Sequence, residues 1–304
     1  MISGQEHLSA REERLGWILG SSRSGSTWLA SMLAAIDGAT SIDDPHLGHH
    51  LGTWRPLSIA WATAASEPEL TTLRELKRES DHYFFSDRYR EAWLPALRDL
   101  ITARFGAQLE EQEPDADDPV LFVKEPGSQA TETIFELFPR SRLIFLLRDG
   151  RDVVESWLDA YQDGSWAIEG GAFPVARSGR GALVRWLSAV WAHRTQVVGA
   201  AFARRPAEAR VLVRYEDLLR KPATELGRIC DLFDLDTSEL EAIAERHRFS
   251  RISPTERGAN QHARSASPGR WRSSMSRSEQ RAMEEVMGPV LNQCGYPPVR
   301  PAAA

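Results

Sequence analysis

The feature that most constrains this chain is an eight-residue loop, GSSRSGST, at residues 20–27. A short apolar run at residues 15–19 precedes it, which predicts a buried strand. A helix is expected to follow from Trp28 to Ile36. Glycines let a backbone fold around an anion, and the N-terminus of a helix points amide hydrogens toward it. We therefore predict a strand–loop–helix unit that binds a phosphate-like group, in preference to an ordinary glycine-rich turn.

The loop has the G-x-x-x-x-G-x-T frame of a P-loop with one departure. Ser26 occupies the position where nucleotide-hydrolysing enzymes carry a lysine for the β- and γ-phosphates. The cation is instead Arg23, whose guanidinium suits bidentate contact with phosphate or sulfate oxygens. The missing lysine disfavours the metal-dependent chemistry of an ATPase. A sulfuryl group carries less negative charge than a phosphoryl group, so its transfer can proceed with protein donors and no metal.

Composition and charge narrow the class of protein. The chain has 304 residues, 42% hydrophobic and 26% charged, which is ordinary for a globular protein with a sizeable core. A formal net charge of −6 argues against nucleic acid as a partner, so an anionic ligand needs a local basic patch. The two cysteines, Cys230 and Cys294, lie too far apart for a paired-cysteine zinc site or a disulfide framework. Residues 1–14 lack a signal-peptide core, and no apolar run approaches the roughly 20 residues of a membrane span. We therefore expect a cytoplasmic protein without stable membrane insertion.

Apolar runs and helical patterns alternate along the chain. Further buried strands are predicted at residues 120–123, 142–147 and 210–214. Residues 37–51, rich in Gly, Asp, Pro and His, are expected to be irregular. Helices are predicted at residues 69–105 (two helices), 131–138, 151–161, 182–203, 215–246 (several helices) and 276–292.

This alternation predicts a single α/β domain over residues 1–304. We expect a P-loop-type three-layer fold with a central parallel sheet flanked by helices, and ligands at the carboxyl ends of the strands. A helical insert at about 45–105 and a lid-like segment at about 162–180 are expected to shape a pocket for an acceptor, because substrate choice usually resides in such segments.

Two segments together resemble the nucleotide-binding motifs of sulfotransferases that use 3′-phosphoadenosine 5′-phosphosulfate (PAPS). SRSGSTW at residues 22–28 is similar to the family's 5′-phosphosulfate loop, P-[KR]-[SA]-G-[ST]-T-[WL], without the leading proline. RDGRDVVES at residues 148–156 resembles the segment in which an arginine and a serine eight residues later hold the 3′-phosphate. Two later segments extend the resemblance: RYEDL at 214–218, and RSASPGRWR at 264–272, which is similar to a late R-K-G-x-x-G-x-W-[KR] segment. The resemblance implies that the donor is bound by Arg23, Ser24, Gly25, Ser26, Thr27, Trp28, Arg148, Ser156, Tyr215 and Arg264.

The arginine-rich region from Arg248 to Arg281 supports an anion site from composition alone. It contains eight arginines and only two acids, Glu256 and Glu279. An acidic protein that concentrates arginine in this way has a local anion to bind. A solvated loop or a nucleic-acid contact is the alternative interpretation.

The sequence after the second expected strand resembles tyrosylprotein sulfotransferases and their bacterial relatives more than the cytosolic branch. That branch has K-D-P where this chain has Lys124-Glu125-Pro126, whereas the cytosolic branch has K-T-H with a catalytic histidine. The resemblance implies Lys124 as proton donor or charge stabiliser, beside Arg23. The branch takes its general base from a segment about twenty residues after the first loop. Asp44 is the positional match, His46 is its rival, and Glu125 is a third candidate.

The implied activity is sulfuryl transfer from PAPS to a hydroxyl of a small-molecule, lipid or carbohydrate acceptor, as in secondary metabolism. His46, His49 and His50 could share a helix face, but no carboxylate or cysteine completes a metal site, so no metal is expected. A P-loop nucleotide kinase or NTPase remains an alternative function. A catalytically silent nucleotide-binding partner protein on the same fold is another, and a homodimer is left open.

Overall fold

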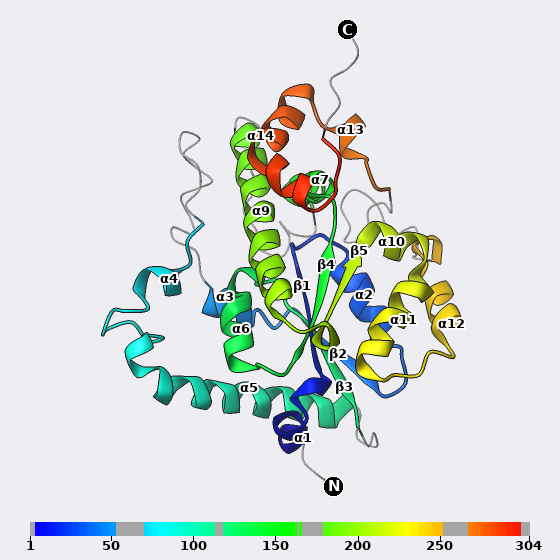
Figure 1. Cartoon of the computed structure of the whole chain (residues 1–304). Helices are drawn as coiled ribbons and strands as arrows, with labels where there is room; N and C mark the ends of the chain where they lie inside the picture. The colour runs from blue at the N-terminus through cyan, green and yellow to red at the C-terminus, as the bar shows by residue number, and fades with distance from the viewer. Residues whose placement is uncertain are drawn as a thin grey trace.

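A computed structural model describes residues 4–52, 70–112, 118–162, 164–165, 179–251 and 267–298. A five-stranded parallel sheet lies at its centre, in the order β2-β3-β1-β4-β5. The chain places its first strand in the middle, then fills one side of the sheet before the other (Figure 1). The strands are β1 (Leu15–Gly20), β2 (Ala39–Asp43), β3 (Val120–Lys124), β4 (Arg142–Leu147) and β5 (Arg210–Arg214).

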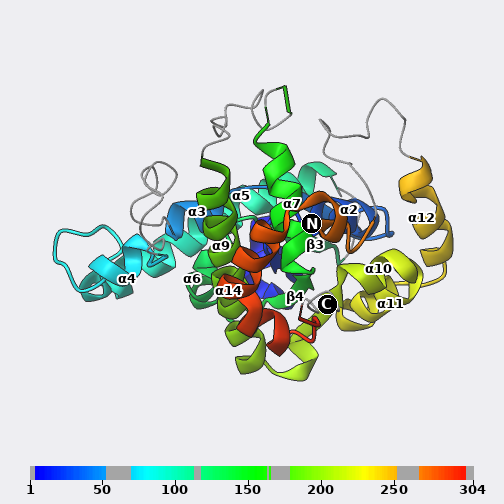
Figure 2. The same ribbon diagram turned by 90° about the horizontal axis from the view of Figure 1, so that it is seen from above.

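Helices cover both faces of the sheet, which makes the predicted three-layer α/β fold correct (Figures 1 and 2). One face packs against α2 (Ser26–Leu33), α10 (Tyr215–Arg220), α11 (Pro222–Phe233) and α12 (Leu240–Arg246). The other face packs against α1 (Gly4–Ala10), α5 (Arg90–Gln112), α6 (Thr131–Leu137), α7 (Gly150–Ala160), α9 (Arg180–Arg204) and α14 (Arg277–Gln293). The remaining α-helices of the described chain are short: α3 (Leu47–Leu51), α4 (Leu73–Lys77) and α13 (Trp271–Ser274).

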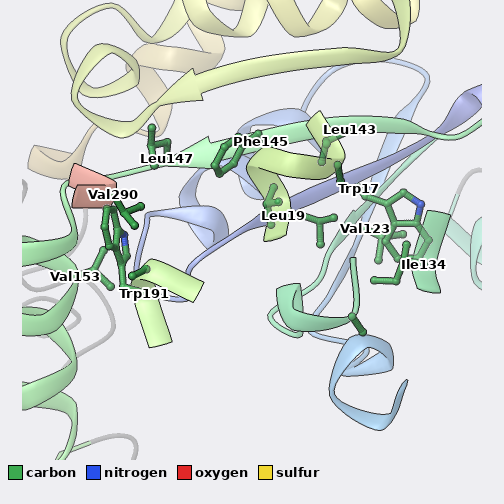
Figure 3. Packing of buried hydrophobic residues seen from close by; sticks show 14 of the residues in the cluster. Trp17, Leu19, Val123, Ile134, Leu143, Phe145, Leu147, Val153, Trp191 and Val290 are labelled. Atoms are coloured by element: carbon green, nitrogen blue, oxygen red, sulfur yellow. The ribbon is translucent and has the colours of Figure 1, made fainter. Parts of the chain in front are cut away.

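Side-chain alternation along the strands explains the two cores. In β1, Trp17 and Leu19 enter the core beneath α9, and Ile18 enters the opposite core beneath α2. Trp17 and Leu19 lie beside Leu143 and Phe145 of the neighbouring strand (Figure 3). Because both faces of the sheet are covered, the three central strands β1, β3 and β4 are apolar along most of their length, which made them visible in the sequence.

The region from residue 37 to 51 corrects the sequence analysis, which predicted it to be irregular. It contains strand β2 and helix α3. Strand β2 has the sequence ATSID and pairs with β3 alone, at the edge of the sheet. An edge strand is specified by its ladder and its packing more than by its own β-propensity, so its sequence carries a weak signal. The pairing places Asp43 opposite Lys124.

The last helix confirms its predicted start. The Ser276 side chain accepts a hydrogen bond from the Glu279 amide, and the Glu279 carboxylate accepts one from the Ser276 amide. This capping box satisfies amides that the first turn of the helix leaves without partners. Within the described residues, no helix is both long and apolar enough to cross a membrane.

Candidate active site

The loop at residues 20–27 lies at the carboxyl end of the central strand, between β1 and α2. Arg23 and Gly25 both have left-handed backbone, with φ of 70° and 91°. A Cβ at Gly25 would sit 2.6 Å from the ring of Tyr215, so only glycine fits beneath that ring. The loop is thus held in one compact conformation at the point where the strand order reverses, which is where α/β sheets bind ligands.

The interior of the loop fits a tetrahedral anion. The Ser24 hydroxyl is buried and has no hydrogen-bond partner within the described residues. Gly20 is fastened separately, because its amide donates to the Ser128 hydroxyl at 3.0 Å and its carbonyl accepts from the same hydroxyl. A buried hydroxyl without a partner is unfavourable, and the oxygen of a bound anion would satisfy it.

The second predicted motif meets the loop directly. Arg23 Nε donates to Ser156 Oγ at 3.1 Å, and an Arg148 guanidinium nitrogen donates to the Arg23 carbonyl at 2.8 Å. The Arg148 guanidinium also stacks on Tyr215, with Cζ 4.4 Å from the ring centroid. Residues 125 and more positions apart in sequence therefore form one cluster of cations and hydroxyls.

The predicted aromatic residues lie at the base of this cluster. Trp28 contacts Tyr215 edge to face, with ring centroids 6.3 Å apart, and its indole nitrogen donates to the His247 carbonyl at 2.7 Å. Trp28 is half-buried and Tyr215 is buried. Tyr215 thus supports both the loop glycine and the Arg148 side chain.

Lys124 lies on the other side of the loop, at the end of β3. Its ammonium nitrogen is 2.9 Å from Thr27 Oγ1 and 2.8 Å from a carboxylate oxygen of Asp44. Asp43 is more distant, at 3.8 Å. Burial raises the pKa of the Asp43 carboxyl above its usual value, and Lys124 opposes that rise. The lysine is buried, whereas the two carboxylates are open to solvent.

The histidines in and next to α3 follow β2 at the same end of the sheet as Lys124. His46 and Asp44 have positive φ values of 56° and 51°, and both are exposed. The His46 and His49 ring centroids are 5.5 Å apart, and His49 Nδ1 lies 3.1 Å from Gln129 Nε2. Burial, with help from Arg194, lowers the pKa of His49 to about 4, so its imidazole is neutral near pH 7. Over the described residues, no three His, Cys, Asp or Glu side chains gather as metal ligands would.

Glu125 follows Lys124 and is shielded from solvent, whereas Asp43 and Asp44 are exposed. Its side chain is buried, and burial raises its pKa to about 7. The Gly127 amide donates to Oε1 at 2.5 Å. Its second oxygen, Oε2, makes no hydrogen bond of normal geometry with the described residues.

A sequence model of the sulfotransferase family matches residues 17–239, about three quarters of the chain and all of the cluster just described. The chain belongs to the sulfotransferase family. The structure of a mouse sulfotransferase complexed with PAP is similar to this sulfotransferase, with 14% identity, a TM-score of 0.56, and coverage of 96% of this chain and 91% of that one. A sulfotransferase from Mycobacterium avium is similar at 16% identity and a TM-score of 0.51, covering 95% and 78%. At such identities these structures show the shared fold. No curated protein matches the chain.

One residue that contacts the loop was not predicted from the sequence of this sulfotransferase. Arg194 on α9 is buried, and its guanidinium donates to the Ser22 hydroxyl of the loop at 3.0 Å. Burial lowers its pKa to about 10, and Tyr161 and Glu125 favour its charged form. The signal was present in the predicted helix, because Arg194 recurs on the same face as the buried Leu187 and Trp191.

The C-terminal segment is attached to α7 between the two predicted nucleotide-binding residues. Asp152 accepts hydrogen bonds from the amides of Gly269 at 2.7 Å and Trp271 at 3.3 Å. The Arg151 guanidinium packs on the Trp271 ring at 4.3 Å. Trp271 is therefore a buried anchor beside the site. Arg264 lies outside the described residues.

The two segments predicted to shape an acceptor pocket are only partly described. Residues 53–69 of the helical insert lie outside the described residues, as do residue 163 and residues 166–178 of the lid-like segment. Of the described insert, α3 borders the site, whereas α5 lies across the amino ends of the strands (Figure 1). The role of both segments stays a prediction.

Proposed function

We propose that this sulfotransferase moves a sulfuryl group from PAPS to a hydroxyl of a small-molecule, lipid or carbohydrate acceptor. The observation that carries the proposal is the convergence of Arg23, Arg148 and Ser156 on one loop. A donor with two separated anionic groups, a 5′-phosphosulfate and a 3′-phosphate, explains why two distant basic motifs meet there. The neighbouring Lys124-Glu125-Pro126 segment supports a place in the tyrosylprotein-like branch.

We assign the donor contacts as follows. The loop amides, Ser24 and Arg23 hold the 5′-phosphosulfate, while Arg148, Ser156 and Arg264 hold the 3′-phosphate; Ser26, Thr27, Trp28 and Tyr215 complete the donor side. When bound, the donor supplies the activated sulfuryl group. Arg23, Arg148 and Ser156 are already joined by hydrogen bonds, so these donors need little reorganisation when the anion binds.

Lys124 acts on the bond that breaks. Its ammonium contacts Thr27 at the start of α2 and is almost fully buried, so its charge acts at low dielectric. In our proposal it stabilises the negative charge that develops on the oxygen bridging sulfur and phosphorus, together with Arg23. No metal is needed for this role, since two fixed cations already flank the site.

Asp44 is the proposed general base. Its carboxylate is about half exposed and touches Lys124, so an acceptor hydroxyl can reach it from solvent. The contact with Lys124 holds the Asp44 carboxylate beside the donor loop. His46 is exposed on the same turn and is the rival. Glu125 is buried, which argues against direct contact with an acceptor.

A stacked aromatic pair, which packs against the hydrophobic core, lies near Arg194. The rings of Trp157 and Tyr161 stack at the end of α7, with centroids 5.4 Å apart. Burial raises the pKa of Tyr161 to about 12, and the Arg194 charge opposes that rise. The stack therefore lies within electrostatic reach of the residue that contacts the donor loop.

The test is Arg23→Ala, assayed by transfer of label from radiolabelled PAPS to a panel of hydroxyl acceptors. We expect an unchanged circular dichroism spectrum and a loss of at least about 100-fold in transfer, the effect of removing a charge-assisted donor. Full activity would reject the assignment of the loop. Calorimetry separates the alternatives. Mg²⁺-dependent ATP binding would favour an NTPase, and binding of 3′,5′-adenosine bisphosphate without transfer to any acceptor would favour a silent partner.

A further inference from the structure

The Glu125 carboxylate lies where two loops of the carboxyl edge meet. Its side chain is only 2% exposed. From one side the Gly127 amide donates to Oε1 at 2.5 Å. From the other side the first turn of α3 approaches, where the amides of Leu47 and Gly48 favour the charged form of the carboxyl. One side chain thus lies between the β3–α6 connection and the start of α3.

The backbone at the start of α3 is in direct contact with the backbone of the loop after β3. A Cβ at Gly48 would lie 2.1 Å from the Gly127 carbonyl oxygen, and a Cβ at Gly127 would lie 2.3 Å from the Gly48 carbonyl carbon. Such an approach leaves no room for other side chains between the strands' ends. The Glu125 carboxylate therefore fixes a junction that two glycines make possible.

The junction controls the position of Asp44. Asp44 and His46 both have positive φ, a conformation that persists only where the surroundings hold it. At its start the turn is fixed by the Asp44 amide, which donates to the Lys124 carbonyl at 3.0 Å. At its end it enters α3, whose first amides face Glu125. Lys124, the last residue of β3, and Glu125, the residue after it, thus hold the turn at its two ends.

The same carboxylate is linked to the donor side of the site. Glu125 favours the charged form of Arg194, and Arg194 donates to the Ser22 hydroxyl in the loop. The acceptor-side turn and the donor loop therefore share one buried pair of opposite charges beneath them.

We propose that Glu125 is a positioning residue that holds the segment 44–48 against the donor loop and does not itself exchange a proton with the acceptor. The proposal rests on the proposed function in one respect, since Asp44 is the base that it positions. The buried location of Glu125 favours this role over that of a base, because an acceptor must reach the atom that takes its proton.

Ionisation of Glu125 should tune this junction. Burial raises its pKa to about 7, the backbone amides oppose the rise, and the Asp44 carboxylate adds to it. Arg194 faces it from α9. Because the raised pKa means that the closed, buried junction binds the Glu125 proton more tightly than an opened, hydrated one, the junction should loosen as pH rises through about 7.

The experiment is hydrogen exchange of the amides of residues 44–51 and 127, corrected for intrinsic rates, between pH 6 and pH 8. The variants are Glu125→Gln and, as matched control, Glu132→Gln. The control removes an exposed carboxylate of α6 that lies 3.6 Å from Arg204 at the end of α9. We expect wild-type protection to fall several-fold from pH 6 to pH 8. Glu125→Gln should lower it about tenfold at pH 6, because its NH2 group cannot accept a hydrogen bond from an amide, and should remove the pH dependence, while Glu132→Gln changes neither.

Calorimetric titration with 3′,5′-adenosine bisphosphate separates the two proposals. Weak or absent binding by the wild type would reject the proposed function and leave the exchange result valid. The positioning role would be overturned by unchanged protection in Glu125→Gln, or by pH dependence that survives in that variant.

Discussion

Two buried glutamates lie at opposite ends of the strands, and their hydrogen-bond partners differ. We call the side of the sheet where the strands begin its amino edge and the side where they end its carboxyl edge. Glu12, just before β1, is fully buried and accepts hydrogen bonds from the Ser141 amide at 3.1 Å and from the Arg140 amide. Its other oxygen pairs with Arg98. Glu125, just after β3, has one firm amide hydrogen bond and an oxygen without a normal partner in the described residues. The buried glutamate at the amino ends of the strands thus has partners for both of its oxygens, whereas the one at the carboxyl ends is only partly satisfied and has a raised pKa.

This difference predicts that substitutions at the carboxyl edge change activity and those at the amino edge change stability. The largest effect is expected for Lys124→Ala. Removing a buried cation beside the donor loop should lower transfer by about 1000-fold, because the developing charge loses a fixed counter-charge. The unfolding free energy should change little, since the exposed Asp44 can return to water. Steady-state kinetics and urea denaturation measure the two quantities. A large loss of stability with retained activity per folded molecule would reverse the comparison.

Glu12→Ala is the matched substitution at the other edge. It leaves Arg98 and two backbone amides without their buried acceptor, which should destabilise the fold by about 3–5 kcal/mol. Affinity of the folded fraction for 3′,5′-adenosine bisphosphate should stay at the wild-type value. Urea denaturation combined with calorimetry checks this. Unchanged stability would show that the amino edge has no such role.

The pH dependence of stability should identify Glu125 as the carboxyl-edge acid that is unfavourable when charged. Its pKa is about 7 in the folded protein against 4.5 ordinarily, so the folded state binds its proton more tightly. Between these pH values the unfolding free energy should therefore fall as pH rises, by up to about 3 kcal/mol in total. Gln is neutral at every pH, so Glu125→Gln should lack this contribution. Thermal melts at pH 5 and pH 8 measure it, and equal slopes in both proteins would contradict the assignment.

The smallest effect is expected for Trp28→Phe. The change keeps an aromatic ring against Tyr215 but removes the hydrogen bond to the His247 carbonyl. Stability should fall by about 1 kcal/mol, and donor affinity by only a few-fold. A loss as large as that of Lys124→Ala would mean that the indole has a role beyond packing.

Much of the fold could be predicted from the sequence because the central strands are buried on both faces. The apolar runs that became the central strands β1, β3 and β4 needed no tertiary information, and the edge strand β5 was visible from the short apolar run VLV at its middle. Strand β2 could not be found in this way, because its residues gain their extended conformation from the ladder with β3. Because β2 was not predicted, the sequence also did not show that Asp43 lies opposite Lys124 on the neighbouring strand.

The site divides in the same way. Arg23 was predicted from its own strand–loop–helix unit, and Arg148 and Ser156 from the resemblance of one contiguous segment to the family's 3′-phosphate motif. Arg194 reaches the loop from a helix more than 150 positions later, and only the packing of α9 on the sheet places it there. The burial of Glu125 likewise depends on the contact between Gly48 in α3 and Gly127 in the loop after β3. Such contacts are properties of the assembled edge and leave no pattern within a single segment.

The measurement that tests the central claim most directly is calorimetry of the wild type and Arg148→Ala with 3′,5′-adenosine bisphosphate and with 5′-adenosine monophosphate, both without Mg²⁺. We predict that the wild type binds the bisphosphate at least about 100-fold more tightly than the monophosphate, because the 3′-phosphate adds charge-assisted contacts. Arg148→Ala should lose most of that preference. Equal affinity of the wild type for the two nucleotides would contradict the account.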